Sequence, residues 1–124
     1  QGLANLPPSL RAMLPEVDLS NARHYSRFRE SLAEAHGDLS EDSIARYYEC
    51  FALWDEFMAA SASQHLSKYP ETRMVVLAGA AHIEDKTGIP DRITRRTGLK
   101  TFTILPQSVG WTPENLPNIE EPTR

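Results

Sequence analysis

A histidine that directly follows an apolar run is the first residue of this sequence with the potential for chemistry. The run, residues 74–81, reads MVVLAGAA and is followed by His82. Uninterrupted apolar residues are typical of a strand covered on both faces of a parallel sheet, where ligands bind at the carboxyl ends of the strands. Gly79 lets the backbone turn sharply there. The spacing leaves open whether His82 is a ligand, moves protons or bonds the local backbone.

A carboxylate beside an aromatic stripe is the second chemical feature. The stripe consists of Tyr47, Phe51, Trp54 and Met58. Its spacing is helical, and we interpret it as core rather than as a cofactor surface. Asp55 adjoins the stripe, and because an unpaired buried carboxylate is costly, we expect it to pair with Arg92 or His82. Glu84 and Asp85, close after His82, fit either a metal set or a solvated loop.

A tyrosine and a pair of arginines complete the candidates. Tyr48, next to the stripe, has the phenol that binds ferric iron in catalase-type ligation, and it also fits a surface position. Arg92 and Arg96 are four residues apart, so on a helix they face one way. They are suited to clamping paired carboxylates such as haem propionates, or they form a solvated basic face. The remaining histidines show no spacing that indicates a site: His24, His36 and His65.

The elements that must position these residues are predicted from helix caps and from apolar spacings of three and four. Ser20 is the expected N-cap of a helix that ends near Gly37. Ser40 is the expected N-cap of a much longer helix over about residues 41–68. A short helix is predicted over residues 91–96. Together these patterns place Asp55 in the long helix and Arg92 in the short one.

Two β-branched segments predict strands around the short helix. The apolar run over 74–81, which ends in glycine and small residues, and the alternating, β-branched residues 101–105 give a strand, helix, strand unit, for which a right-handed parallel crossover is the default. We therefore predict an α/β fold with a parallel central sheet flanked by helices, and a sheet that is incomplete in this chain. One domain is expected, with a helical connector over 1–39, core motifs over 40–106 and an extended tail over 107–124.

Bulk composition excludes some classes of protein. The chain has 124 residues, is 40% hydrophobic and 24% charged, and carries a net charge of −4. This acidic balance argues against nucleic-acid binding, and no apolar run reaches the roughly 18 to 20 residues needed to span a bilayer. Cys50 is the single cysteine, so no intrachain disulfide is possible. Because the sequence begins at Gln1 rather than at methionine, we expect a fragment or a processed product.

Several motifs together resemble one protein family. Residues 53–59 (LWDEFMA), 75–83 (VVLAGAAHI), 88–92 (GIPDR) and 103–106 (TILP) stand in the order and at the intervals found in the carboxyl-terminal half of the ChaN-like family. The resemblance covers about residues 40–106. ChaN-like proteins are haem-binding, iron-regulated lipoproteins of the bacterial envelope, and they are related to the Tiki proteases and to erythromycin esterase-like proteins.

The resemblance implies haem as the ligand, a homodimer around the haem pocket and a role in haem or iron uptake. It also implies the periplasm or the outer membrane, with membrane contact only through a lipid anchor outside this chain. The implied iron ligand is His82. The further candidate pocket residues are Tyr48, Trp54, Asp55, Arg92 and Gly79. Residues 84–87 depart from the family, which often has a Tyr-Gly-rich segment there, so aromatic haem contacts from this loop are not expected.

Two other functions remain as alternatives to a binding protein. The first is a metal-dependent hydrolase related to the Tiki and esterase branches, with His82 as ligand of a divalent metal or as general base and Asp55 as its acidic partner. The second is a structural domain whose aromatic helix face mediates dimerisation. We favour haem or iron binding over enzymatic activity.

Overall fold

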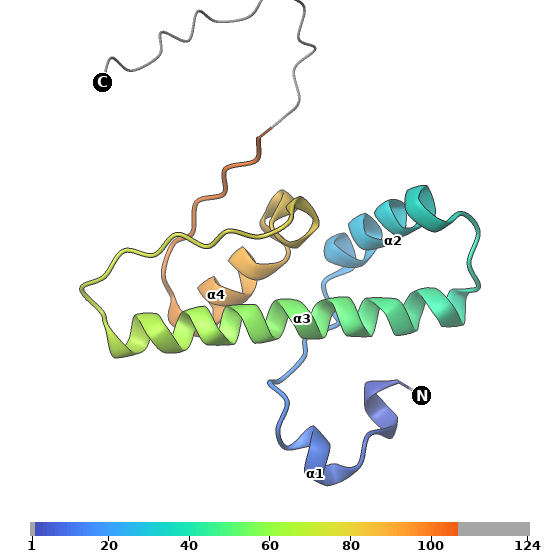
Figure 1. Ribbon diagram of the computed structural model, residues 1–124, viewed down its shortest axis with the longest axis horizontal. Helices are drawn as coiled ribbons and strands as arrows, with labels where there is room; N and C mark the ends of the chain where they lie inside the picture. The colour runs from blue at the N-terminus through green and yellow to red at the C-terminus, as the bar shows by residue number, and fades with distance from the viewer. Residues whose placement is uncertain (1, 107–124) are drawn as a thin grey trace, which may run out of the picture.

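The computed structural model describes residues 2–106, which form helices joined by loops and extended segments (Figure 1). The helices are α1 (Pro8–Arg11), α2 (Ala22–His36), α3 (Glu41–Lys68) and α4 (Ile89–Thr97), with 3₁₀ turns η1 (Leu3–Asn5), η2 (Ala80–His82) and η3 (Glu84–Lys86). Helix α3 is the platform: α2 and α4 pack on one side of it, and the amino-terminal segment lies on the other. Within this part of the chain, no helix has both the length and the apolar character to cross a membrane.

Helix α3 follows the predicted boundaries because both of its ends are marked in the sequence. The Ser40 side chain accepts a hydrogen bond from the backbone N–H of Ser43, as an N-cap does. At the other end Tyr69 precedes Pro70 and takes non-helical dihedrals (φ −130°, ψ 71°), because the proline ring disfavours the helical region for the residue before it. The predicted helix over about residues 41–68 is therefore confirmed.

The buried face of α3 differs from the aromatic stripe that we expected to form the core. Trp54 is 67% exposed and Tyr47 is also exposed, while Phe51 and Met58 are only partly buried. The buried residues of the helix are Ile44, Tyr48, Ala52, Asp55, Glu56, Ala59, Ala62 and Ser63. Small and polar side chains dominate this face because α2 and α4 approach it closely. Periodicity alone does not distinguish such a face from a neighbouring aromatic one.

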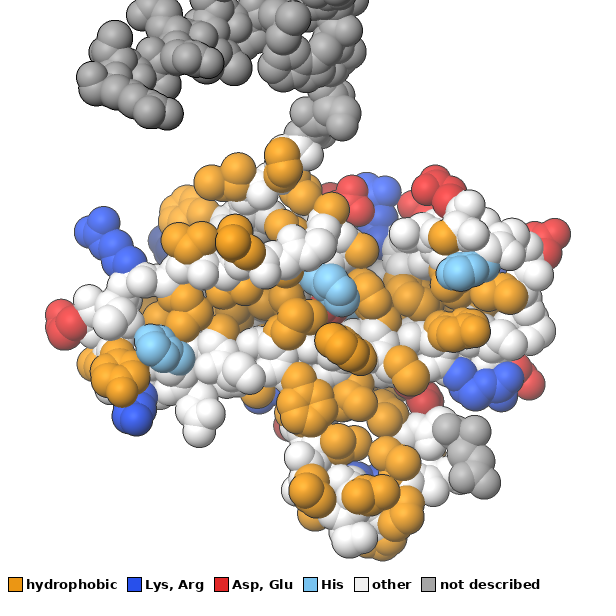
Figure 2. Space-filling view, viewed as in Figure 1, with side chains coloured by type: hydrophobic (Ala, Val, Ile, Leu, Met, Phe, Trp, Pro, Cys, Tyr) orange, Lys and Arg blue, Asp and Glu red, His pale blue; other side chains and the backbone are white. Residues whose placement is uncertain are grey.

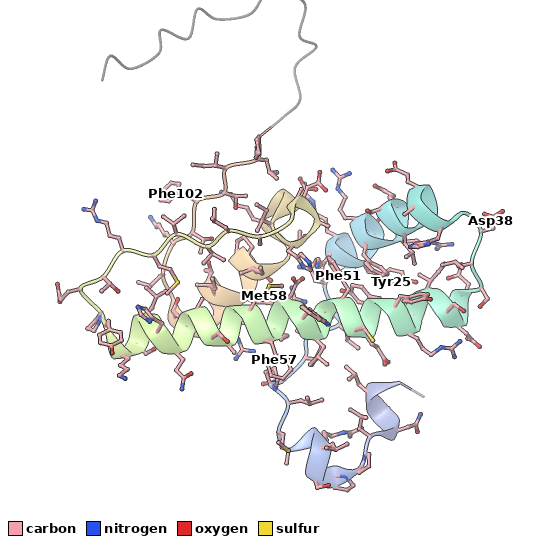
Figure 3. The ribbon with its side chains drawn as sticks, viewed as in Figure 1. Tyr25, Asp38, Phe51, Phe57, Met58 and Phe102 are labelled. Atoms are coloured by element: carbon pink, nitrogen blue, oxygen red, sulfur yellow. The ribbon has the colours of Figure 1, made fainter. Side chains whose placement is uncertain are left out.

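Helix α4 packs against the carboxyl-terminal half of α3 and forms the apolar core. Ala59 and Ala62 of α3 meet Ile89 and Ile93 of α4. Partly buried residues surround them: Met58, Leu66, Met74 and Ala78. Figure 3 shows Met58 on the side of α3 that faces α4 and Phe57 on the opposite side. Gly98 ends α4 with φ of 72°, a left-handed conformation that glycine adopts without strain.

Helix α2 packs against the amino-terminal half of α3 through aromatic rings. Asn21, one residue after the predicted cap Ser20, provides the N-cap and accepts a hydrogen bond from the backbone N–H of His24. The ring of Tyr48 lies 4.9 Å from that of Tyr25, centroid to centroid. Further ring contacts join Phe28 to Tyr48 and to Phe51. The predicted end of this helix near Gly37 is confirmed by the φ of 70° at that residue.

The predicted parallel sheet is wrong: residues 2–106 contain no strand. The segments 74–78 and 101–105 run without backbone pairing, and their alternating apolar side chains point into solvent, with Leu77 93% and Phe102 91% exposed. Figure 2 shows hydrophobic side chains gathered above α3 in the view, where these two segments run. β-Branched residues favour an extended segment that suits a sheet. The hydrogen bonds of a sheet form only when partner strands are present. The described fold is therefore helical rather than α/β.

Polar contacts also tie α4 to α3, and they centre on Glu56, which is fully buried. Arg92 Nε lies 3.0 Å from its Oε1, and Arg95 Nη2 donates to the same oxygen at 2.6 Å. Arg96 donates to the other oxygen, and the backbone N–H of Asp18 also donates to Oε1. Burial by itself raises the pKa of Glu56, but the hydrogen bonds from Arg96 and Arg95 outweigh it, so the pKa lies below its ordinary value.

Replacement of Glu56 by glutamine is expected to destabilise the fold by about 3 kcal/mol at neutral pH, since it leaves the buried Arg92 without its nearer charge partner. Because the folded-state pKa of Glu56 is lowered, its stabilising effect is present above the ordinary value near 4.5 and is lost as pH falls through the folded value. Denaturant unfolding between pH 3 and pH 7 measures both. Glu71→Gln, at an exposed position, is the matched control. Equal pH profiles for the two variants would contradict this role.

Candidate functional site

Asp55 of α3 is fully buried and lies between two histidines. Its Oδ1 is 2.6 Å from Nδ1 of His82, and its Oδ2 is 2.9 Å from Nε2 of His24. Arg92 Nη1 is 3.9 Å from Oδ2. A buried carboxylate is stable only when neighbouring groups replace its lost hydration, and these three side chains do so. The expected pairing partners, Arg92 and His82, are both present.

The carboxylate fixes the proton positions on both imidazoles. A carboxylate accepts hydrogen bonds and does not donate them, so Nδ1 of His82 carries its proton and donates it to Asp55. The second ring nitrogen of His82, Nε2, then holds a lone pair. His24 Nε2 faces the other carboxylate oxygen at close range, but its N–H does not lie along the line to Oδ2, so this contact is mainly electrostatic. The site therefore contains one oriented imidazole with a free donor nitrogen.

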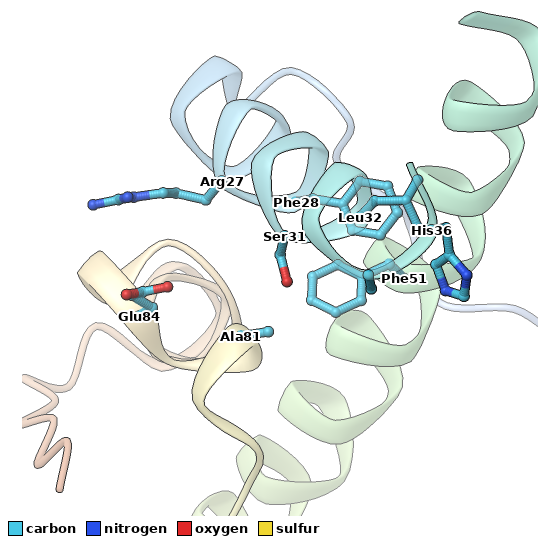
Figure 4. Close-up of a pocket in the computed structure, with 9 residues that line it drawn as sticks. Arg27, Phe28, Ser31, Leu32, His36, Phe51, Ala81 and Glu84 are labelled. Carbon is cyan, nitrogen blue, oxygen red and sulfur yellow. The ribbon is translucent and has the colours of Figure 1, made fainter. Parts of the chain in front are cut away.

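His82 lies beside Phe51, a residue that lines a largely apolar cavity. Its ring stacks on that of Phe51, with the centroids 4.6 Å apart and the planes at 15°. Phe51 in turn lines a cavity of about 210 Å³ between α2, α3 and the η2–η3 loop. Figure 4 shows Phe28 and Phe51 at its centre, with Arg27 and Glu84 towards one end and His36 towards the other. The side chain of His82 is one-quarter exposed, so an outside ligand can reach it.

Arg92 is buried and engaged with the protein itself. Besides Glu56, it bonds the carbonyl oxygens of Thr87 at 3.0 Å and Gly88 at 3.2 Å. Arg96, which we expected on the same helix face, also donates to Glu56. The carboxylate that these arginines clamp is thus a side chain of α3. Arg92 is therefore neither free to bind haem propionates nor part of a solvated basic face.

Tyr48 is buried rather than at the surface, and its hydroxyl lies 3.1 Å from Nδ1 of His24. Burial raises the pKa of Tyr48, which outweighs the opposing effect of Arg92, so the phenol keeps its proton. A protonated phenol that bonds an internal histidine is poorly suited to bind iron. Tyr48 therefore belongs to the same group of buried polar side chains as His24 and Asp55.

The remaining predicted residues lie around the site or outside it. Gly79, the N-cap of η2, has φ of −60°, so it does not use the conformational freedom of glycine. Trp54 takes part in none of the contacts around Asp55. Asp85 pairs with Arg23 and Arg27 of α2 at 3.2 and 2.8 Å. This ion pair holds Asp85 in a positive-φ conformation (53°) that non-glycine residues rarely adopt.

The divalent-metal alternative required several ligands around His82. Among residues 2–106, no group of three or more histidine, cysteine, aspartate or glutamate side chains is arranged to hold a metal ion. The carboxylate nearest His82 is that of Asp55, and each of its oxygens already faces an imidazole nitrogen rather than a shared metal position.

His24 is the site residue that sequence reasoning missed. It shares one face of α2 with Phe28 and Leu32 at intervals of four, a spacing that predicts an inward position. Phe51, which was assigned to the core, instead stacks on His82 and lines the cavity. Neither role can be read without knowing that α2 packs against the middle of α3.

The chain was compared with known protein families and structures. The family model described as "Haem-binding uptake, Tiki superfamily, ChaN" matches residues 1–93, which confirms the resemblance. The match begins well before the range 40–106 that carried the resemblance, so it includes α2 and His24. No curated protein and no solved structure gave a significant match.

Substitution of Gly88 by alanine is expected to disturb the site, because a Cβ there would overlap the carbonyl oxygen of His82 and lie 3.1 Å from Oδ2 of Asp55. We expect a loss of about 1 to 3 kcal/mol in the free energy of unfolding, measured with denaturant. Gly79→Ala is the control, since the nearest atom to its Cβ is Cδ2 of His82 at 3.7 Å. Equal stability of the two variants would show that the close approach of Gly88 to the His82 carbonyl does not require glycine at this position.

Proposed function

Because the chain belongs to the haem-binding uptake family ChaN of the Tiki superfamily, we propose that it binds haem with Nε2 of His82 as the iron ligand. The observation that carries the proposal is the 2.6 Å hydrogen bond from His82 to Asp55, which fixes the ring and leaves Nε2 as an electron-pair donor. Histidine is a common axial ligand of haem iron. Metal-binding histidines usually donate their other N–H to a carboxylate or carbonyl, as His82 does.

The surroundings of His82 suit a flat, largely apolar ligand. Phe51 stacks on the imidazole and continues into the cavity, whose other apolar walls include Phe28 and Leu32. Haem supplies the iron when bound, and the chain supplies one nitrogen and an aromatic surface. The role of Asp55 is to keep a proton on Nδ1, so that the lone pair of the neutral ring lies on Nε2.

The cavity is too small to enclose haem by itself. Its volume of about 210 Å³ lies below the roughly 300 Å³ of the smallest typical ligand pockets, so haem bound here would extend over the surface. A second copy of the chain would cover the exposed side, and a two-fold homodimer is the commonest arrangement for this. We include such a dimer in the proposal.

The biological role that we propose is haem or iron uptake in the bacterial envelope. The support for uptake is the description of the family, and the support for the envelope is the resemblance to ChaN-like lipoproteins. The protein would reside in the periplasm or at the outer membrane, attached only through a lipid anchor. The net charge of −4 is consistent with a small-molecule ligand rather than a nucleic acid.

Titration with hemin is expected to give a shifted Soret band in the wild-type chain and in Tyr48→Phe, because the Tyr48 hydroxyl bonds His24 rather than the ligand. His82→Ala should abolish the shift. Asp55→Asn should weaken binding by about 10- to 100-fold, as loss of the partner of a metal-bound histidine does. Absorbance at the Soret maximum measures all four proteins.

His65→Ala is the matched control, since His65 is an exposed histidine on the same helix and contacts Tyr69 rather than the site. It should bind hemin as the wild type does. The proposal would be rejected by a wild-type chain without a Soret shift, or by His82→Ala binding as tightly as His65→Ala.

A further inference from the structure

A second histidine, buried in the interior, contacts the carboxylate that orients the proposed haem ligand. His24 is 1% exposed and lies in the first turn of α2. Its Nε2 is 2.9 Å from the Asp55 oxygen that His82 leaves free, and its Nδ1 is 3.1 Å from the Tyr48 hydroxyl. The ring also packs beside Phe51, with the centroids 5.4 Å apart. His24 thus reaches His82 only through Asp55 and Phe51.

Chemistry determines which groups donate and which accept along the row Tyr48, His24, Asp55 and His82. The Asp55 carboxylate only accepts, so the Nε2 of His24 that faces it carries the proton. In the neutral ring Nδ1 is then an acceptor, and the protonated hydroxyl of Tyr48 donates to it. From the other side, His82 donates its own N–H to the same carboxylate. Two imidazoles therefore share the negative charge of Asp55.

We propose that His24 is a positioning residue that limits, through Asp55, how strongly His82 donates electrons to a bound metal. A carboxylate that accepts from a ligating histidine makes that histidine more basic. The N–H of His24 draws part of the carboxylate charge away from His82 and so restrains this effect. Tyr48 strengthens the restraint, because a hydrogen bond to Nδ1 polarises the His24 ring. The haem part of the inference rests on the proposed function.

Removal of His24 therefore has a definite direction. In His24→Phe the ring volume remains but both nitrogens are lost, and Arg92, 3.9 Å away, is the remaining partner of Asp55 Oδ2. The carboxylate then interacts more strongly with His82, which becomes more imidazolate-like. A stronger donor stabilises ferric over ferrous iron, so the reduction potential of bound haem falls.

Two measurements test the inference, one of them without haem. In the unliganded protein, NMR of the His82 Nδ1–H proton should show a downfield shift in His24→Phe and a smaller shift in the same direction in Tyr48→Phe. His24→Gln should restore the wild-type signal, because its amide can donate to Asp55 and accept from Tyr48. In the hemin complex, the midpoint potential should be highest in the wild type, lower in Tyr48→Phe and lowest in His24→Phe.

The outcomes separate this inference from the proposed function. If hemin does not bind the wild-type chain, the proposed function fails, while the proton signal of the unliganded protein still tests the role of His24. If hemin binds but the signal and the potential are unchanged in both His24→Phe and Tyr48→Phe, His24 is structural only and the inference is overturned. His65→Phe, an exposed change of the same chemistry, should leave both readouts unchanged. Should His24→Phe fail to fold, Tyr48→Phe carries the test alone.

Discussion

Two adjacent carboxylates inside the fold constrain the rest of the described structure. Asp55 and Glu56 follow one another in α3 and are both fully buried. Each would cost several kcal/mol of desolvation without compensation. Because successive helix residues point about 100° apart, the two side chains need different partners. Asp55 is compensated by His24 from α2 and by His82, whereas Glu56 is compensated by the arginines of α4.

This division of partners connects stability to function. The arginines around Glu56 fix α4, and with it the loop that follows His82 and ends at Gly88. The histidines around Asp55 tie α2 and η2 to α3, and one of them, His82, remains one-quarter exposed. In the proposed function, the carboxylate that needs compensation also orients His82 as the iron ligand. The apolar cavity beside Phe51 would then contribute part of the surface against which a porphyrin lies.

The sequence predicted the helices well because their caps are local. Ser40, Gly37 and Gly98 mark helix ends by their own conformational preferences, and the pairing of Asp55 followed from the cost of burying a charge. The sheet was wrong because apolar, β-branched segments indicate only that a strand is possible. Pairing depends on partners, which the segments 74–78 and 101–105 lack within residues 2–106. His24 and the partners of Glu56 required the packing of α2 and α4 on α3, which spacing in one helix does not reveal. The predicted tail, 107–124, lies outside the described residues.

The most direct test of the account is a double-mutant cycle between Asp55 and His82. The free energy of unfolding would be measured by denaturant for the wild type, Asp55→Asn, His82→Ala and the double variant. If Asp55 holds His82 through a charged hydrogen bond, the two changes are non-additive and the coupling energy is about 1 kcal/mol or more. If the effects add within about 0.5 kcal/mol, the two side chains do not interact in solution, and neither the fixed tautomer of His82 nor its role as a prepared ligand would stand.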